Sequence, residues 1–438
     1  MPVLAAWLLL MPVQLHAENL IEVFNQARQF DPKFHAAESN YLAGREKLPQ
    51  AQAAFMPTLN ARVARNRNNN ETITDNFIPG RPTGDFKSSN TQYTLNLTQP
   101  VYNGAVFAGL QQAKAEVRRA EAEYAAAGQE LILRVAEVYF GFLSAQDSVE
   151  FTQAEKLSIQ RQLESAEGRL KVGLATVTDV HDARARFEIA AAQEIEAQNQ
   201  WQDKREALRE VTGRALEALA RVGLNMPLIT PEPADIHQWV EKSLAQNFQL
   251  HAKHEAAESM RAEVKRLRAG HYPTLDFVGS RTRNDDSGSL TGTGIRSDDT
   301  VLGFQLNMPI FQGGLVRSRT DEAAYRYAAA QQDFEAAQRA TERLARAAYL
   351  GVASGTAKVT SLTQAVVASE SALAAKTEGF SAGISTNIDV LNASRDLYRA
   401  KRDLASARYD YLINLLRLKQ AAGILAEDDL VQINGWLQ

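Results

Sequence analysis

Two stretches of the chain, one after Pro100 and one after Pro309, have the sequence pattern of very long helices. Residues 104–171 contain no proline and are dominated by Ala, Glu, Gln, Leu and Arg, which predicts a helix about 100 Å long at ~1.5 Å per residue. Gly173 and, later in the chain, Gly383 each predict a turn that sends the chain back. Apolar residues recur at heptad spacing in both returning helices, which favours coiled-coil packing. These seams comprise Val180, Ala183, Phe187, Ala190, Ala197, Trp201, Leu208 and Val211, and then Val390, Ala393, Leu397, Ala400, Leu404, Ala407, Tyr411, Leu418 and Ala421.

Strict alternation of apolar and polar residues marks four other segments and predicts β-strands. Their apolar members are Leu59, Ala61 and Val63; Tyr93, Leu95 and Leu97; Leu275 and Phe277; and Leu302, Phe304 and Leu306. Strands of about ten residues with one apolar and one polar face are typical of membrane barrels that enclose water. A soluble sheet covered on one side is the alternative. The Asn-, Asp-, Gly- and Ser-rich residues 67–89 and 283–299 are expected to form exposed loops.

The same order of elements occurs twice. Similar motifs recur at nearly constant spacing, at 55–59 and 271–275, at 97–104 and 306–313, and at 173–176 and 383–386. This repetition predicts two structural halves, residues 18–233 and 234–438, each with helices, two strands and a long helical hairpin. The first half is expected to open with an amphipathic helix. Its apolar face comprises Leu20, Val23, Phe24 and Ala27.

A second helix is predicted to follow the first. Asp31 would cap it, and Pro32 would be its first residue. The helix should run to about Ala54, with a kink at Pro49.

The N-terminus resembles a secretory signal. An apolar run at residues 4–13 is far too short to span a bilayer, and it precedes Ala17, where we expect cleavage of a 1–17 signal peptide. No later stretch approaches the roughly 20 apolar residues of a transmembrane helix. A membrane could therefore be crossed only by the strands. Four strands cannot close on themselves, so several chains would have to contribute to one barrel, and three or more would leave a lumen.

Composition excludes several classes of function. The chain has 48 Lys and Arg against 52 Asp and Glu, a net charge of −4, so no basic surface for nucleic acid is expected. Cysteine is absent, which removes thiol nucleophiles and thiolate metal sites. His251 and His254 have the spacing of a metal pair but no evident third ligand, and a solvated helix face is the better interpretation. Gly292 and Gly294 lack the context of a phosphate loop. We expect no enzyme, metal or cofactor.

Several motifs together resemble the TolC family of outer-membrane export channels over essentially the whole mature chain. They are Val172-Gly173-Leu174, Thr178-Asp179-Val180, Pro273-Thr274-Leu275-Asp276, Pro309-Ile310-Phe311-Gln312-Gly313-Gly314, Asp389-Val390-Leu391 and Ala407-Arg408-Tyr409-Asp410-Tyr411-Leu412-Ile413-Asn414. The resemblance implies an α+β membrane protein: a homotrimer whose twelve-stranded β-barrel, four strands per protomer, continues into a coiled-coil α-helical barrel. It also implies short equatorial helices in 215–246 and 427–438.

The resemblance assigns expected roles to residues at the two hairpin turns. Asp179 and Asp389 match acids at the narrow periplasmic entrance, where six carboxylates would attract polyvalent cations. Alternatively, the Thr-x-x-Asp spacing of both acids is that of a capping box that starts a helix, and the two roles are compatible. Gly173 and Gly383 match the glycines at the tip where adaptor hairpins dock, and they are also expected to cap helices in the left-handed conformation.

The chain departs from the family at the positions that clamp the entrance. In the family a tyrosine and an arginine bond to the entrance acid or its neighbour, here Asp179 and Thr178. The matching positions are Phe380 and Ser385, and a second family acid is replaced by Asn392. These replacements remove a hydroxyl, a positive charge and a negative charge. We expect an entrance that is clamped less tightly or by other residues.

The resemblance implies a passive exit duct of a tripartite efflux pump or a type I secretion system. Its expected location is the outer membrane, in contact with lipid and extending into the periplasm. Its expected partners are a periplasmic adaptor and an inner-membrane pump or ABC transporter. The cargo could be drugs, metal ions or a secreted polypeptide. The alternative function is that of the adaptor itself, which also uses long α-hairpins but lacks paired amphipathic strands at their base.

Overall fold

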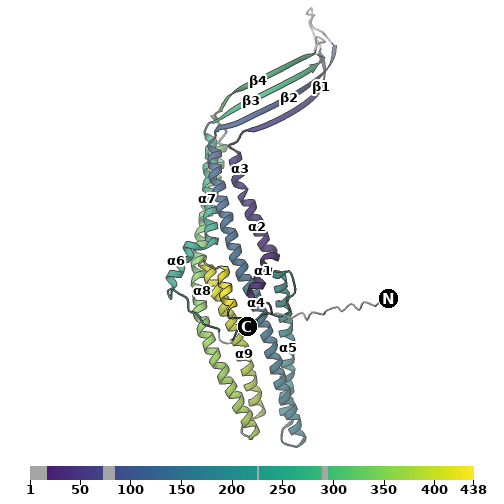
Figure 1. Ribbon diagram of the computed structural model, residues 1–438, viewed down its shortest axis with the longest axis vertical. Coiled ribbons are helices and arrows are strands. Elements are labelled where there is room, and N and C mark those ends of the chain that lie inside the picture. The colour runs from purple at the N-terminus through teal and green to yellow at the C-terminus, as the bar shows by residue number, and fades with distance from the viewer. Residues whose placement is uncertain (1–16, 73–83, 224–225, 289–293) are drawn as a thin grey trace, which may run out of the picture. The chain divides into compact units, whose positions relative to one another are not determined.

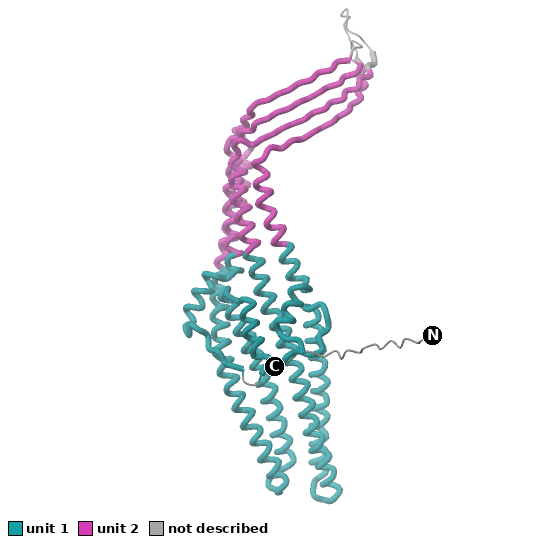
Figure 2. The backbone as a smooth tube through the Cα atoms, in the orientation of Figure 1, with its two compact units in different colours: residues 1–39, 122–251, 336–438 teal, residues 40–121, 252–335 magenta. Residues whose placement is uncertain are grey.

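The computed structural model describes residues 17–72, 84–223, 226–288 and 294–438. Of the predicted signal peptide, only Ala17 falls in this part, and Gly292 lies outside it. The chain divides into two compact units (Figure 2). The first unit comprises residues 1–39, 122–251 and 336–438, and the second comprises residues 40–121 and 252–335. Each unit draws on both predicted halves, so the boundary between residues 233 and 234 stays a prediction.

Helices and strands follow one another in the predicted order (Figure 1). They are α1 Leu20–Phe30, α2 Pro32–Arg45, α3 Lys47–Ala53, β1 Thr58–Thr72, β2 Gly84–Tyr102, α4 Gly104–Lys171, α5 Val177–Thr212, α6 Ile236–Gln246, α7 Phe248–Arg268, β3 Thr274–Ser287, β4 Ile295–Asn307, α8 Leu315–Ser381, α9 Asn387–Ala421 and α10 Glu427–Asn434. A short 3₁₀ turn, Ala269–His271, links α7 to β3.

The long helices match their prediction closely. Helix α4 has 68 residues and its counterpart α8 has 67, so each is about 100 Å long. Helices α5 and α9 fold back from them and bury most of the predicted seam residues. In the first unit these seams join a core of large side chains that includes Tyr139, Phe142, Leu208 and Tyr411. Burial of this apolar surface is the main source of stability for the first unit.

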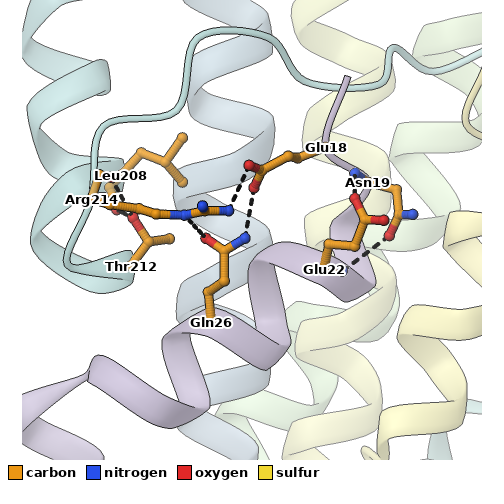
Figure 3. A network of polar contacts seen from close by, with 7 residues as sticks. All are labelled: Glu18, Asn19, Glu22, Gln26, Leu208, Thr212 and Arg214. Atoms are coloured by element: carbon orange, nitrogen blue, oxygen red, sulfur yellow. Dashed lines mark hydrogen bonds and ion pairs between the residues drawn. The ribbon is translucent and has the colours of Figure 1, made fainter. Parts of the chain in front are cut away.

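Helix α1 is held to the first unit by an apolar face and a polar network. Leu20, Val23, Phe24 and Ala27 are all buried, as predicted. Figure 3 shows the guanidinium of Arg214 between Glu18 and Gln26. It donates to the Glu18 carboxylate at 2.6 Å and to the Gln26 amide oxygen at 2.9 Å, and Gln26 donates to Glu18 at 2.7 Å. Each of these three side chains has hydrogen-bond partners among the other two, and together they hold Glu18, near the start of the described chain, against α1 and Arg214.

The break after α2 differs from the predicted kink. Helix α2 ends at Arg45 and α3 begins at Lys47, so the irregularity lies at Glu46, ahead of Pro49. Proline cannot donate to the carbonyl four residues earlier, and its ring clashes with that carbonyl. The carbonyl concerned belongs to Arg45, which explains why the helix breaks there.

The second unit contains one antiparallel sheet of order β1-β2-β3-β4. Its strands have 15, 19, 14 and 13 residues, so the prediction of about ten was too short. The predicted loops 67–89 and 283–299 were also partly wrong. Residues 67–72 pair with 84–89, and 283–286 pair with 295–298. The strands continue through these polar residues because the backbone N–H and C=O groups form hydrogen bonds to the neighbouring strand, whichever side chain the residue carries.

The region between α5 and α6 is extended where a helix was predicted. In the described part of residues 215–235 no helix forms. Glu18 pairs with Leu219 in a parallel bridge and Val222 pairs with Leu437 in an antiparallel one. The predicted short helices are therefore present as α6 and α10 only. No described helix is long and apolar enough to cross a membrane.

Candidate functional site

The turns at the ends of the two long hairpins are built alike. Gly173 and Gly383 have φ of 75° and 77°, in the left-handed region that favours glycine. In the first turn the amide of Leu174 donates to the Arg169 carbonyl at 2.8 Å, and in the second Ile384 donates to Gly379 at 2.7 Å. These bonds close α4 and α8 with the same C-terminal capping motif. The predicted structural role of both glycines is confirmed.

The two entrance acids cap the helices that follow these turns. The Asp179 carboxylate accepts from the Thr176 amide at 2.9 Å, and the Thr176 hydroxyl accepts from the Asp179 amide at 3.2 Å. Thr386 and Asp389 form the same pair of bonds at the same distances. Both acids are therefore members of complete capping boxes, as the spacing predicted.

Capping leaves part of each carboxylate available to other partners. In both acids only Oδ2 accepts the capping bonds. The Oδ1 atom of Asp389 lies 3.9 Å from the Lys376 ammonium. Bonds from the Thr176 amide and hydroxyl lower the pKa of Asp179, and those from Thr386, with a smaller contribution from Lys376, lower the pKa of Asp389. Both acids thus carry full negative charge near neutral pH while retaining one oxygen outside the capping bonds, which in Asp389 lies near Lys376.

The residues at the clamp positions make contacts other than those of the family pattern. The ring of Phe380 lies under the guanidinium of Arg169, with 4.3 Å between the guanidinium carbon and the ring centre. Ser385 donates its amide to the Gly379 carbonyl at 3.1 Å. Thr178 is exposed, whereas Asn392 is half-buried. In the part of the chain that the structure describes, neither Thr178 nor Asp179 hydrogen-bonds to the second hairpin.

Arg169 was not anticipated from the sequence. It lies in the last turn of α4, where a basic side chain is favoured by the helix dipole, and so its presence had an ordinary explanation. Its contact with Phe380 joins the α4–α5 hairpin to the α8–α9 hairpin at their tips. A cation over an aromatic face is an attractive contact that needs no hydroxyl.

Further polar contacts join α4 to α9 along the first unit. Arg402 donates to Glu155 at 2.7 Å, and the side chain of Glu155 is only 4% exposed. Ser158 and Ser394 lie 3.1 Å apart, and Tyr409 donates to Asp147 at 2.7 Å. Burial raises the pKa of Asp147. These pairs bind one hairpin to the other, and the sequence did not predict them.

The two histidines of α7 make contacts within the protein. His251 bonds to the Ala245 carbonyl at 2.9 Å, and the His254 ring packs against Phe334. Among the described residues, no group of three or more His, Cys, Asp or Glu side chains is placed to hold a metal ion.

Comparison with known proteins identifies the family. The model of the outer membrane efflux protein family matches residues 23–214 and 239–424, one segment in each half. The chain belongs to this family. It is 34% identical over 424 residues to the outer membrane protein TolC of Vibrio cholerae, covering 96% of this chain and 94% of that protein. It is 31% identical to the alkaline protease secretion protein AprF of Pseudomonas aeruginosa, covering 97% and 88%.

Solved structures of efflux-family channels share the fold. VceC of Vibrio cholerae superposes with a TM-score of 0.77 at 21% identity, covering 92% of this chain and 96% of VceC. The CmeC outer membrane channel of Campylobacter jejuni superposes with a TM-score of 0.78 at 17% identity, covering 96% and 90%. The predicted fold class, a protomer of a trimeric TolC-like channel with four strands and two long hairpins, is confirmed.

Membership of the efflux family also confirms the predicted function and location. The protein is an outer-membrane channel for efflux or type I secretion, and it extends into the periplasm. Channels of this family form trimers and act with efflux or secretion partners. The relatives are channel and secretion proteins, in keeping with the expectation of a conduit.

Proposed function

We propose that three copies of this chain form a passive duct whose periplasmic entrance consists of the hairpin tips. The outer edges of β1 and β4 have no partner strand in the described sheet. An unpaired edge cannot remain open in hydrocarbon, so β4 of one copy would pair with β1 of the next. Twelve strands would close in this way, and the long helices would continue the duct into the periplasm.

Asp179 and Asp389 are proposed to form the ring of charge at the entrance. The observation that carries this role is their equivalent placement at the start of α5 and α9, with one carboxylate oxygen of each outside the capping bonds. In three copies, six such groups would converge on one axis. They would attract polyvalent cations, and any driving force for transport would come from the partner pump.

The hairpin tips are proposed to bind a periplasmic adaptor, which in turn would bring an inner-membrane pump or ABC transporter. Four large apolar side chains near Gly173 and Gly383 are exposed: Val172, Leu174, Val177 and Ile384. Ile384 is 85% exposed. Apolar side chains gathered at one end of a surface are typical of a contact with another protein.

Recording from single channels would test the acid ring. We expect a cation-selective pore that polyvalent cations such as hexamminecobalt block, with the block at least roughly tenfold weaker in the double variant Asp179→Asn, Asp389→Asn. Asparagine retains an oxygen that can accept the capping bond, so the variant removes charge and keeps the helix start. Asp203→Asn with Asp403→Asn is the matched control on the same two helices. If both double variants were blocked equally, Asp179 and Asp389 would have no role in the pore and would serve only as helix caps.

The same block should depend on pH in a defined direction. In the single chain, capping lowers the pKa of both acids, and repulsion among six converging carboxylates would raise it. Block should therefore be lost as the pH falls, and comparison of variants isolates the contribution of capping. Thr176→Val with Thr386→Val removes the hydroxyl bonds and should move the loss of block to higher pH. Thr→Ser at the same positions keeps the hydroxyls and should leave the midpoint in place. A midpoint that is the same in all three proteins would contradict this explanation.

A further inference from the structure

The register of the sheet places apolar and charged residues in separate bands on one face. Directly paired residues share a face. On one face lie Leu59, Ala61 and Val63 of β1; Leu97, Leu95 and Tyr93 of β2; Leu275, Phe277 and Gly279 of β3; and Leu306, Phe304 and Leu302 of β4. All of these residues belong to the ends of the strands nearest the helices. Most of the larger side chains among them are exposed, so this band is the lipid-facing part of the sheet.

Basic residues follow the apolar band on the same face. On β1 they are Arg65 and Arg67, on β2 Lys87, and on β3 Arg281 and Arg283, which pair with Leu95 and Tyr93. Arg65 pairs with Thr91 and Arg67 with Ser89, whereas Lys87 pairs with Asn69. Arg67 and Lys87 are diagonal neighbours, about 7–8 Å apart at the backbone. On β1 and β2, three cations and two hydroxyl residues therefore occupy one patch, which we call the β1–β2 basic patch.

Acidic residues follow the basic patch on the same face, because Asn69 pairs with Lys87 and Glu71 pairs with Asp85 two residues farther along both strands. In the described chain no carboxylate lies within ion-pair distance of Arg65, Arg67 or Lys87. The neighbouring strands differ, because Asp285 of β3 pairs with Arg296 of β4 at 2.5 Å and lies 3.7 Å from Arg283. Arg283, Asp285 and Arg296 thus form ion pairs within the chain, whereas the side chains of Arg65, Arg67 and Lys87 are exposed and accessible to an external anion.

The patch lies beyond the apolar band, on the side away from the start of α4, and it begins at Arg65 in the middle of β1. Helix α4 begins at Gly104, directly after β2. Lys87 is the fourth residue of β2, and its neighbour Arg67 lies in the second half of β1, so both are on the far side of the apolar band from α4. If the long helices extend into the periplasm, as the proposed function requires, the patch faces the outer leaflet. An arginine facing lipid is strongly destabilising at the bilayer midplane but costs only about 0–1 kcal/mol near the interface. The patch therefore belongs at the level of the lipid headgroups.

We propose that Arg65, Arg67 and Lys87 bind the phosphate groups of a phosphorylated glycolipid in the outer leaflet. Guanidinium groups bind phosphate oxygens in bidentate fashion, and an ammonium adds a third charge-assisted bond. Ser89 and Thr91 pair with Arg67 and Arg65 on the same face, and the Ser89 hydroxyl contacts that of Ser287 at 2.6 Å. The apolar band directly beneath the patch would receive the acyl chains of the same molecule. This proposal rests on the proposed duct, because it needs the sheet to span the outer membrane.

Binding of a defined lipid would test the proposal. The trimer would be titrated in detergent with fluorescent lipid A, a glycolipid that carries two phosphates, and with its dephosphorylated form. We expect the variant Arg65→Gln, Arg67→Gln, Lys87→Gln to bind lipid A at least about tenfold more weakly than the wild type. The matched control is Arg62→Gln, Lys114→Gln, Lys265→Gln, which removes the same charge. Arg62 lies on β1 but faces the opposite side, because it pairs with Thr94.

Each outcome has a definite meaning. Tight binding by wild type and control, lost in the basic-patch variant or on dephosphorylation of the lipid, would support the proposal. Equal binding by both triple variants, or equal binding of the dephosphorylated lipid, would overturn it. Preference for phosphatidylglycerol over lipid A would also overturn it, because it would assign the patch to phospholipid. Channel conductance is measured in parallel. A variant that conducts but does not bind lipid would contradict only the lipid site, whereas a wild-type protein that does not conduct would contradict the duct itself.

Discussion

Replacing Arg402 by methionine should loosen α4 from α9 and make the amides around Glu155 exchange hydrogen at least about 100-fold faster. The Glu155 carboxylate is almost fully buried, and the Arg402 guanidinium lies 2.7 Å from it. Removing the guanidinium leaves a buried charge without a partner, a change that typically costs about 3–5 kcal/mol. Because every 1.4 kcal/mol is tenfold in an equilibrium constant, the local opening that permits exchange should become correspondingly more frequent.

Two further variants separate charge burial from loss of packing. Arg399→Met removes a similar side chain one turn earlier on α9, where Arg399 lies 3.9 Å from Asp403 and both are well exposed, and exchange near Glu155 should stay unchanged. Glu155→Leu combined with Arg402→Met replaces the pair by apolar groups and should restore most of the protection. If the double variant exchanged as fast as Arg402→Met alone, the unpaired charge would not be the cause.

The features that depend on local sequence were predictable. Helix α4 matched its prediction at both ends, because the stretch lacks proline and Gly173 follows it in the left-handed conformation. The Thr-x-x-Asp spacing likewise predicted both capping boxes, since the bonding partners are three residues apart. In each case a few neighbouring residues determine the geometry.

The features that depend on distant partners were not predictable. The strands extend through Asn-rich residues because neighbouring strands pair with them, and composition alone had indicated loops. Glu155 and Arg402 meet through the packing of helices from the two halves of the chain. From the sequence, each of these two residues has the pattern of an ordinary exposed charge on a helix. Phe380 could be identified as a departure from the family pattern, but its partner Arg169 belongs to the other hairpin.

Because Phe380 replaces the tyrosine of the family pattern and contacts Arg169, we predict that the Arg169–Phe380 contact limits opening of the entrance. The contact joins the tips of the two hairpins, which would have to separate if the entrance widens. A cation–π contact contributes about 0.5–2 kcal/mol. If three copies open together, its loss would favour the open state by about 1.5–6 kcal/mol, roughly a tenfold to ten-thousandfold change in the ratio of open to closed channels. Arg169→Gln should therefore raise conductance and drug leakage.

A double-mutant cycle would decide whether the contact itself is responsible. Arg169→Gln, Phe380→Leu and the double variant should raise the open fraction to a similar extent, because each removes the same interaction. Lys171→Gln removes a neighbouring charge and should have little effect. Additive effects in the cycle would contradict the contact as a clamp.

Adding the family's clamp groups should act in the opposite direction. Phe380→Tyr with Ser385→Arg supplies a hydroxyl and a second cation at the tip, and both could bond to the exposed Asp179 or Thr178 across the entrance. We expect lower leakage than in the wild type. Unchanged conductance and leakage would show that these positions do not control the entrance. Because the phenylalanine ring is retained in tyrosine, Arg169 would keep its contact, and any tightening could be assigned to the added groups.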